Sequence, residues 1–220
     1  MAAVSKKKMS DDVAFALRQP HEISVQTIKN ARNDKNLQTL ERMAFNDKWP
    51  LKTRWKSFMI LTEIKGAKSL SQIKRALLSK TWYMRSAGLT ALKNIDPQAA
   101  KKWAYNKLNN DPALLVRTKA LEILKNEKSE KVKELFWKKV YSADSLHRNK
   151  SLWIRGDLAR ILLKEPRKKD LRRWVRLLHE SDQELQTVAS YALSKIKSDG
   201  SKNAENISYW QKKYPSSKKL

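Results

Sequence analysis

The stretch NDPALLVRTKALEIL, residues 110–124, decides the fold of this chain. It begins with an Asn-Asp-Pro turn, in which the aspartate can cap a helix and the proline can occupy the first helical turn. An aliphatic-Arg pair follows, and small or apolar residues then recur at the three- and four-residue spacing of an amphipathic helix. The stretch therefore predicts a turn that leads directly into a packed helix.

Four other stretches repeat this pattern, so that five copies begin 31, 32, 38 and 31 residues apart. Each copy has apolar or small residues at the same distances after its Arg position. A period of this length is typical of stacked helical repeats. The copies span residues 53–61, 84–92, 116–124, 154–162 and 185–193. They predict an all-α protein, a right-handed α-solenoid of about five helical hairpins with capping helices at both ends.

The turn signals between the copies predict where each hairpin lies. Residues 1–20 are expected to be a polar lead-in with a short amphipathic segment that ends before Pro20. The repeat array is expected over 21–200, and a capping helix with a basic tail over 201–220. A polar connection at 142–151 accounts for the longer spacing between the third and fourth copies. The expected helix pairs are 36–46 with 51–64, 69–79 with 83–94, 97–108 with 113–125, 130–141 with 152–164, and 168–178 with 183–196.

The chain is strongly basic, with 48 Lys and Arg residues, 22 Asp and Glu residues and a net charge of +26. Residues 1–110 carry a net +14 and residues 111–220 a net +12, so the excess is spread along the array. Such a field attracts acidic partners. A basic proteome or a requirement for solubility would produce the same excess, so charge alone does not identify the partner.

Several classes of site are excluded or disfavoured by composition. The absence of cysteine excludes disulfides, thiolate zinc sites and cysteine nucleophiles. The three histidines His21, His147 and His179 share no metal-ligand spacing, and neither a phosphate loop nor a nucleophile elbow is present. We therefore expect no metal, no cofactor and no enzymatic activity.

Nothing in the sequence predicts membrane insertion or export. No apolar run reaches the roughly 18 residues that a membrane-spanning helix needs. The first residues lack the apolar core of a signal peptide. We expect a cytoplasmic protein, or a periplasmic one if a signal peptide has been removed, and a monomer by default.

With this register, the chain resembles the HEAT-repeat superfamily. Residues 110–124 are the copy most similar to the HEAT pattern, and the resemblance extends over about residues 36–196. The short repeat is similar to the bacterial HEAT-like type first described in phycobilisome lyases. The resemblance implies a helical scaffold that binds a macromolecular partner and has no catalytic function.

A more distant resemblance is to the HEAT-like alkylpurine DNA glycosylases, which are also basic and rich in tryptophan. NKSLWIR, residues 149–155, looks like their Trp-aliphatic-x-Arg helix start, and Trp82-Tyr83 looks like their aromatic pair. Ala87 stands where those enzymes carry an aspartate one helical turn later. Because that carboxylate is missing, the resemblance does not imply that this chain excises bases.

The repeated arginines form the first set of candidate residues. An Arg at this position can bridge to a turn aspartate, such as Asp47, Asp111 or Asp182, or to backbone carbonyls of a neighbouring repeat. A phosphate-binding ladder is the alternative reading. We expect the structural role for Arg54, Arg85, Arg117 and Arg155, with Gln186 in the fifth copy.

A second set of residues is assigned to partner binding. Tryptophans in the turns before second helices either plug the seam between repeats or face a partner, where they can stack or cage a side chain. Tryptophans within first helices, Trp103, Trp137 and Trp174, are expected to be buried. The partner-binding candidates are Trp49, Trp82, Trp153, Lys56, Lys119 and Arg160, together with His147 and Arg148 in the long connection.

A third set, on the first helices, could bind a polyanion. If the array curves as HEAT arrays do, these residues lie on its convex side, with the densest charge at residues 167–176. The candidates are Lys101, Lys102, Lys138, Lys139, Arg167, Lys168, Lys169, Arg172, Arg173 and Arg176. The leading functional hypothesis is a scaffold for an acidic protein partner, and the alternative is sequence-independent binding of DNA or RNA.

Overall fold

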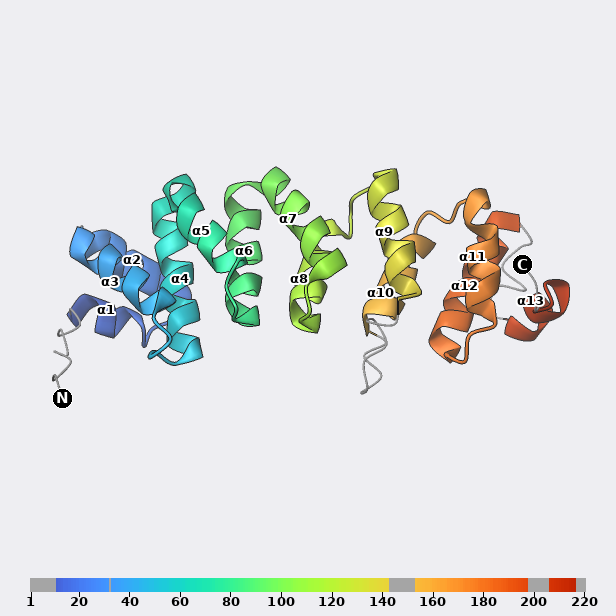
Figure 1. Cartoon of the computed structure of the whole chain (residues 1–220), viewed down its shortest axis with the longest axis horizontal. Coiled ribbons are helices and arrows are strands. Elements are labelled where there is room, and N and C mark those ends of the chain that lie inside the picture. The colour runs from blue at the N-terminus through green and yellow to red at the C-terminus, as the bar shows by residue number, and fades with distance from the viewer. Residues whose placement is uncertain (1–10, 32, 143–152, 198–205, 217–220) are drawn as a thin grey trace. The chain divides into compact units, whose positions relative to one another are not determined.

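The structure, a computed structural model, describes residues 11–31, 33–142, 153–197 and 206–216. These residues form helices joined by turns, without a strand, so the predicted all-α class is confirmed (Figure 1). Within the same ranges, no helix has both the length and the apolar character needed to cross a membrane.

The helices are α1 (Asp11–Ala16), α2 (His21–Ala31), α3 (Asp34–Phe45), α4 (Leu51–Lys65), η1 (Gly66–Ser69), α5 (Leu70–Leu77), α6 (Trp82–Ile95), α7 (Pro97–Asn110), α8 (Leu114–Leu124), α9 (Glu130–Val140), α10 (Trp153–Leu163), η3 (Lys168–Asp170), α11 (Leu171–Leu178), α12 (Gln183–Lys197) and α13 (Ile207–Lys213).

The chain divides into two compact units, Met1–Ile123 and Leu124–Leu220. The division falls at the end of α8, inside the region where a single repeat array was expected. The two units are therefore described separately, as unit 1 and unit 2.

The helix bounds agree with the predicted pairs to within about two residues for most elements, with local exceptions. The 3₁₀ turn η3 forms the first residues of the region 168–178, where one continuous helix was expected, and η1 lies largely before the expected helix 69–79. The last helix, α13, begins at Ile207, within the 201–220 region where a capping helix was expected. The short amphipathic segment expected before Pro20 corresponds to α1, in which Val13 and Ala16 are fully buried.

In unit 1, consecutive helices pack as pairs, and second helices also pack on one another. Helix α3 contacts α4 and α5 contacts α6, while α4 also contacts α2 and α6. The N-terminal part of the core forms because α1 and α2 add apolar side chains to those of α3 and α4. Its buried members are Val13, Ala16, Val25, Ile28, Leu40, Met43, Ile60 and Leu61.

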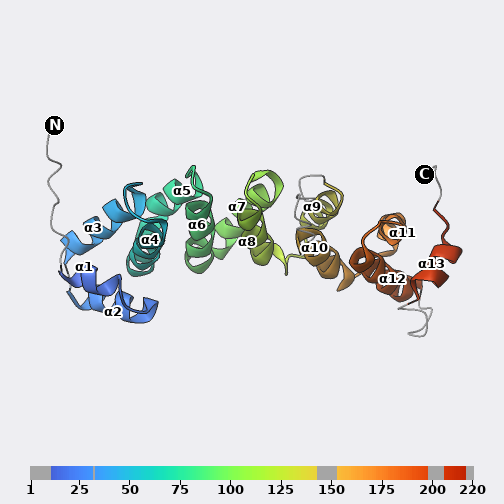
Figure 2. The same ribbon diagram turned by 90° about the horizontal axis from the view of Figure 1, so that it is seen from below.

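In unit 2, α9 packs on α10, α11 on α12, and α10 on α12, and α13 covers α11 and α12 (Figure 2). Its core is rich in tryptophan. Trp137 and Trp174 are buried as predicted and meet edge to face, with ring centroids 4.7 Å apart. Trp210 of α13 is also fully buried, whereas Trp103 in unit 1 is half-buried. First-helix tryptophans therefore hold the helices of unit 2 together.

Candidate partner-binding surface

The repeated arginines are buried and bind carbonyl groups at the ends of the helices that precede them. Arg54 Nε donates to Ala44 O at 3.2 Å, Arg117 Nη1 to Asp111 O at 2.9 Å, and Arg155 Nε to Val140 O at 2.6 Å. Arg85 Nη1 lies 2.9 Å from both Ser79 O and Lys80 O. The last carbonyls of a helix have no partner within it, and Arg54 and Arg155 satisfy such groups, whereas Arg85 and Arg117 bind carbonyls of the turn that follows the helix.

Among the described residues, Arg85 and Arg155 also reach an acidic residue in the turn of the next helix pair. Arg85 binds Asp111, and Arg155 Nη2 lies 3.3 Å from Glu180 Oε2. In the fifth copy, Gln186 keeps the carbonyl contact by donating to Glu180 O at 2.6 Å. Asp182 instead caps α12 by accepting from the Glu184 amide at 2.9 Å. The arginine column thus links a helix pair to its own turn and, at two positions, to the following turn.

Exposed apolar residues gather where the second helices of unit 1 begin. Trp49, Leu51, Trp55 and Trp82 have between 38 and 52% of their surface exposed. We call these four residues the turn-edge strip. The turns that lead into α4, α6 and α8 lie along one edge of unit 1, at the bottom in Figure 1. Large apolar groups in this number are seldom left exposed together without a role in binding.

Side-chain contacts connect the strip across two helix pairs. Leu51 and Trp55 are one helical turn apart on α4, so they share a face. The Trp55 amide donates to the hydroxyl of Tyr83, 3.2 Å away on α6. The Tyr83 ring in turn meets Trp82 edge to face, with centroids 6.0 Å apart. Tyr83 therefore bridges Trp55 and Trp82.

Lysines flank the turn-edge strip. Lys48, Lys52 and Lys80 are exposed and have no acidic partner among the described residues. Asp47 is the one acidic residue in the turns 46–50 and 78–81. The surroundings of the strip are therefore positive, and its apolar residues are bordered by charges that remain available to a partner.

The other predicted partner-binding residues are engaged within the protein or lie outside the described residues. Lys56 Nζ donates to the carbonyls of Leu17, at 2.9 Å, and Gln19, beyond the end of α1. Burial, and then the nearby charge of Lys52, lower the pKa of Lys56. Lys119 pairs with Glu122 at 2.5 Å, and Arg160 pairs with Asp157 at 2.7 Å and with Glu184. His147, Arg148 and the side chain of Trp153 lie outside the described residues.

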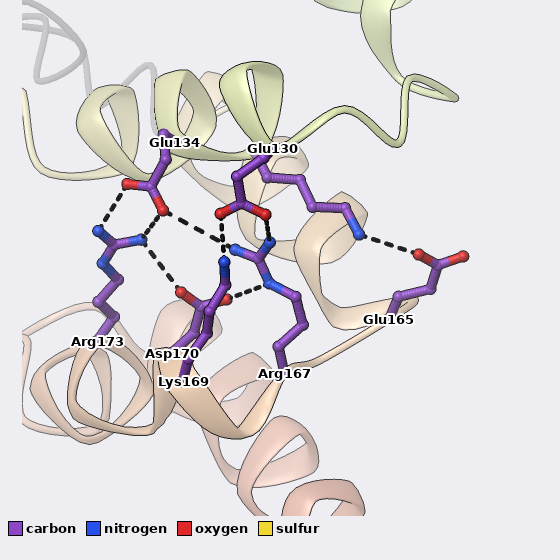
Figure 3. Close-up of polar contacts among 8 residues, drawn as sticks. Glu130, Glu134, Glu165, Arg167, Lys169, Asp170 and Arg173 are labelled. Atoms are coloured by element: carbon purple, nitrogen blue, oxygen red, sulfur yellow. Dashed lines mark hydrogen bonds and ion pairs between the residues drawn. The ribbon is translucent and has the colours of Figure 1, made fainter.

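Three cations of the predicted polyanion surface, Arg167, Lys169 and Arg173, pair with acidic residues of α9 (Figure 3). Arg167 and Lys169 both lie 2.5 Å from Glu130, on its two carboxylate oxygens. Arg173 binds Glu134 through two hydrogen bonds, of 2.7 and 2.8 Å. The hydrogen bond from Lys169 lowers the pKa of Glu130, and that from Arg173 lowers the pKa of Glu134, so both remain ionised. Asp170 accepts from Arg167 at 2.7 Å and from Arg173 at 3.1 Å.

The remaining basic candidates differ in exposure. Lys139 is 4% exposed, so its assignment to an outer basic surface is corrected. Lys101 is half-buried, and Lys102 and Lys138 are exposed. Lys168, Arg172 and Arg176 are exposed on η3 and α11. The cluster at 167–176 thus separates into three cations paired with acids of α9 and three exposed cations on η3 and α11.

Leu51 and Trp55 belong to the strip but were not among the sequence-based candidates. The repeat pattern does indicate Leu51, because Leu51 and the candidate Trp82 occupy equivalent positions, each three residues before a repeated arginine. Each is the first residue of a second helix. Comparing equivalent positions, in addition to searching for tryptophan, would have identified Leu51.

The described residues do not bring metal-ligating side chains together. In those ranges, no group of three or more His, Asp or Glu side chains could hold a metal ion. Ala87, where the glycosylase pattern has a carboxylate, is buried in α6. Neither a protein-family model nor a curated protein sequence matches this chain.

Proposed function

We propose that this chain is a non-catalytic scaffold of the HEAT-repeat type, an α-solenoid of about five hairpins with capping helices, which docks an acidic protein segment on the turn-edge strip. The observation that carries the proposal is the exposure of Trp49, Leu51, Trp55 and Trp82 beside lysines that have no acidic partner among the described residues. The helix pairs of each unit and the buried arginines support the repeat architecture.

The chemistry of the strip favours a partner with apolar and acidic side chains. Burial of large aromatic residues supplies most of the binding energy at interfaces, and charges at the rim steer the approach of a partner. Trp55 and Trp82 are suited to the first role, and Lys48, Lys52 and Lys80 to the second. The expected partner segment therefore places apolar residues on the tryptophans and Asp or Glu beside the lysines.

Two observations favour a protein over a nucleic acid. The exposed apolar residues of unit 1 include Leu51, Leu78 and Leu115, which bury well against apolar side chains but provide no ring for base stacking. In addition, Arg167, Lys169 and Arg173 are already paired with Glu130 and Glu134. A nucleic acid would have to compete with these acidic residues for the same cations.

Site-specific photo-crosslinking tests where the partner binds. We would place benzoylphenylalanine at Trp82 in one variant and at Leu70 in another, in cells that express the protein. Leu70 is a matched control because it is 45% exposed in unit 1 but begins a first helix. The proposal predicts a discrete protein adduct from position 82, resistant to nuclease, and none from position 70. No adduct at 82, or one removed by nuclease, would contradict it.

The affinity of the purified partner provides the quantitative test. Replacing both Trp55 and Trp82 by Ala is expected to weaken binding by about 30-fold or more, as removal of an interface hot spot does. Leu70→Ala is expected to leave the affinity within about twofold. Replacing Lys48, Lys52 and Lys80 by Gln should slow association and reduce its salt dependence. Unchanged affinity of the folded Trp55→Ala/Trp82→Ala variant would exclude the strip as the docking surface.

Nucleic-acid binding is tested separately with a labelled single-stranded DNA. Non-specific binders have dissociation constants of about 10⁻⁴ to 10⁻⁶ M at physiological salt. The scaffold proposal predicts binding weaker than about 10⁻⁴ M. Tighter binding that depends on Trp55 and Trp82 would show that the partner of the strip is a nucleic acid and would contradict a protein partner.

A further inference from the structure

A row of exposed cations in unit 2 remains after the ion pairs with α9 are taken into account. Lys168, Arg172 and Arg176 follow one another at four-residue intervals. Residues four apart on a helix are neighbours on one face. Lys169 and Arg173, each the next residue along, instead pair with Glu130 and Glu134. Among the described residues, Lys168, Arg172 and Arg176 have no acidic partner.

The last two residues of this row line a hollow within unit 2. The hollow has a volume of about 680 Å³. Its walls come from the end of α9, from α11 and from the segment after α13. Besides Arg172 and Arg176, the lining includes Tyr141, Val175, His179 and Pro215. Arg173 and Glu180 also line the hollow, which therefore combines three guanidinium groups and one carboxylate with apolar surface.

The other charged and titratable groups around the hollow are already occupied. Glu180 lies 3.3 Å from Arg155, and Arg173 binds Glu134. His179 Nε2 donates to Tyr214 O at 2.7 Å. The Tyr141 hydroxyl donates to Arg173 O at 2.6 Å, and burial raises the pKa of Tyr141, so the phenol stays neutral. Arg172 and Arg176 are left as the uncompensated charges of the hollow.

Arg176 is held in place without losing its hydrogen-bond donors. Its guanidinium carbon lies 4.3 Å from the centroid of the Tyr141 ring. A stacked guanidinium covers its face but keeps the N–H groups along its edge free. Arg172 and Arg176 also repel each other, because like charges one helical turn apart are unfavourable. A bound dianion would relieve that repulsion and accept hydrogen bonds from both residues.

We infer that this hollow binds a phosphate monoester dianion, with the phosphate between Arg172 and Arg176 and the organic group against Val175 and Pro215. Free phosphate would use the same two arginines but would leave the apolar wall unfilled. The site lies wholly in unit 2 and uses no residue of the turn-edge strip, so it stands independently of the proposed docking function.

The test is a titration of the full chain with phenyl phosphate, in which binding is monitored by the NMR chemical shifts of the backbone amides. Saturable shifts are expected at residues 172–179 and at Ser216, with weaker binding of inorganic phosphate at the same residues. Arg172→Gln/Arg176→Gln should weaken phenyl phosphate binding at least tenfold. The charge-matched control is Lys164→Gln/Lys197→Gln, since both lysines are exposed in unit 2 and neither lines the hollow. It should bind as the wild-type chain does.

Three outcomes would overturn the inference. Shifts that do not saturate, or that persist in Arg172→Gln/Arg176→Gln, would mean that these arginines hold no anion. If the control variant lost as much affinity for phenyl phosphate, the loss would be explained by the change in overall charge and not by these two arginines. Equal affinity for inorganic and phenyl phosphate would show that the apolar wall does not contribute, which would exclude a monoester as the preferred ligand.

Discussion

Arg85 donates two parallel hydrogen bonds to Asp111, from Nε to Oδ2 and from Nη2 to Oδ1, each 2.7 Å long. The Asp111 side chain is 1% exposed. Its carboxylate also accepts from the Ala113 amide at 3.0 Å and lies 3.3 Å from Lys107 Nζ. This carboxylate is therefore fully coordinated, and it joins helix α6 to the turn between α7 and α8.

Breaking this pair should be costly for unit 1. Removal of one member of a buried ion pair leaves the other charge without compensation, at a cost of about 3–5 kcal/mol. We expect that cost for both Arg85→Gln and Asp111→Asn, measured by urea unfolding. Arg54→Gln is the control, because Arg54 makes one carbonyl contact, at 3.2 Å, and no ion pair with the residues that the structure describes. It should cost about 1 kcal/mol. Equal costs for Arg85→Gln and Arg54→Gln would contradict the prediction.

The same pair predicts a loss of stability in acid. Burial opposes ionisation of Asp111, but the hydrogen bonds from Arg85 and the Ala113 amide outweigh it and lower the pKa of the carboxyl. A lowered folded-state pKa gives stability that is present above the unfolded pKa of about 3.9 and is lost as pH falls through the folded value. The unfolding free energy of the wild-type chain should therefore fall more steeply below about pH 4 than that of Asp111→Asn. Parallel curves for the two proteins would contradict this prediction.

The pH dependence of the unfolding free energy also contains contributions from exposed acidic residues, which added salt can separate from that of Asp111. Hydrogen bonds from Lys169 and Arg173, respectively, lower the pKa values of Glu130 and Glu134, but both side chains are about half exposed. Salt screens exposed pairs far more than buried ones. Added salt should therefore flatten their part of the pH dependence and leave most of the difference between wild type and Asp111→Asn.

Much of the helical layout could be predicted because local signals mark the helix ends. Asp96 accepts from the Ala99 amide at 2.9 Å and caps α7, and Pro97 occupies the first helical position. Both roles depend on neighbouring residues in the sequence, as the capping rules require. The apolar spacing after each arginine likewise gave correct positions for the second helices.

Which basic residues form ion pairs could not be predicted in the same way. Arg173 and Glu134 are 39 residues apart in the sequence, and Lys169 and Glu130 are also 39 apart. Which lysine or arginine meets an acid depends on how two helix pairs pack, and composition carries no such information. The tryptophans posed a similar problem, since Trp82 at the start of α6 and Trp174 within α11 differ in exposure because of tertiary packing.

Two buried serines should respond in opposite ways to replacement by alanine. Ser24 Oγ lies 2.6 Å from Ala16 O and 2.7 Å from Pro20 O, so Ser24→Ala removes buried hydrogen bonds to these carbonyls, which keep only their backbone donors, the amides of Gln19 and Ser24. We expect a loss of about 1–2 kcal/mol. Ser57 Oγ is buried in α4 and has no hydrogen-bond partner among the described residues. Ser57→Ala removes an unsatisfied hydroxyl and improves helix propensity, so it should stabilise unit 1 by up to about 1 kcal/mol. Thermal unfolding of both variants tests the contrast, which a loss in Ser57→Ala would contradict.

Two glycines within helices offer a final contrast, because their neighbours differ in freedom to move. A Cβ at Gly156 in α10 would lie 2.8 Å from Glu184 Oε1, at the end of a flexible and partly exposed side chain. Glu184 can turn away, and Arg160 keeps its contact with Asp157, so the loss is that of an exposed ion pair, less than about 1 kcal/mol. The gain in helix propensity is about 1 kcal/mol, and Gly156→Ala should be neutral or stabilising.

At Gly88 in α6, a Cβ would instead lie 3.0 Å from Leu77 Cγ and 3.1 Å from the Leu77 backbone nitrogen. Leu77 is 1% exposed, so relief requires α5 to shift relative to α6. Overpacking of this kind costs about 1–3 kcal/mol, which exceeds the gain in propensity. Gly88→Ala should therefore lower the unfolding free energy while Gly156→Ala does not. A stabilising Gly88→Ala substitution would mean that α5 and α6 are less closely packed than their contacts indicate.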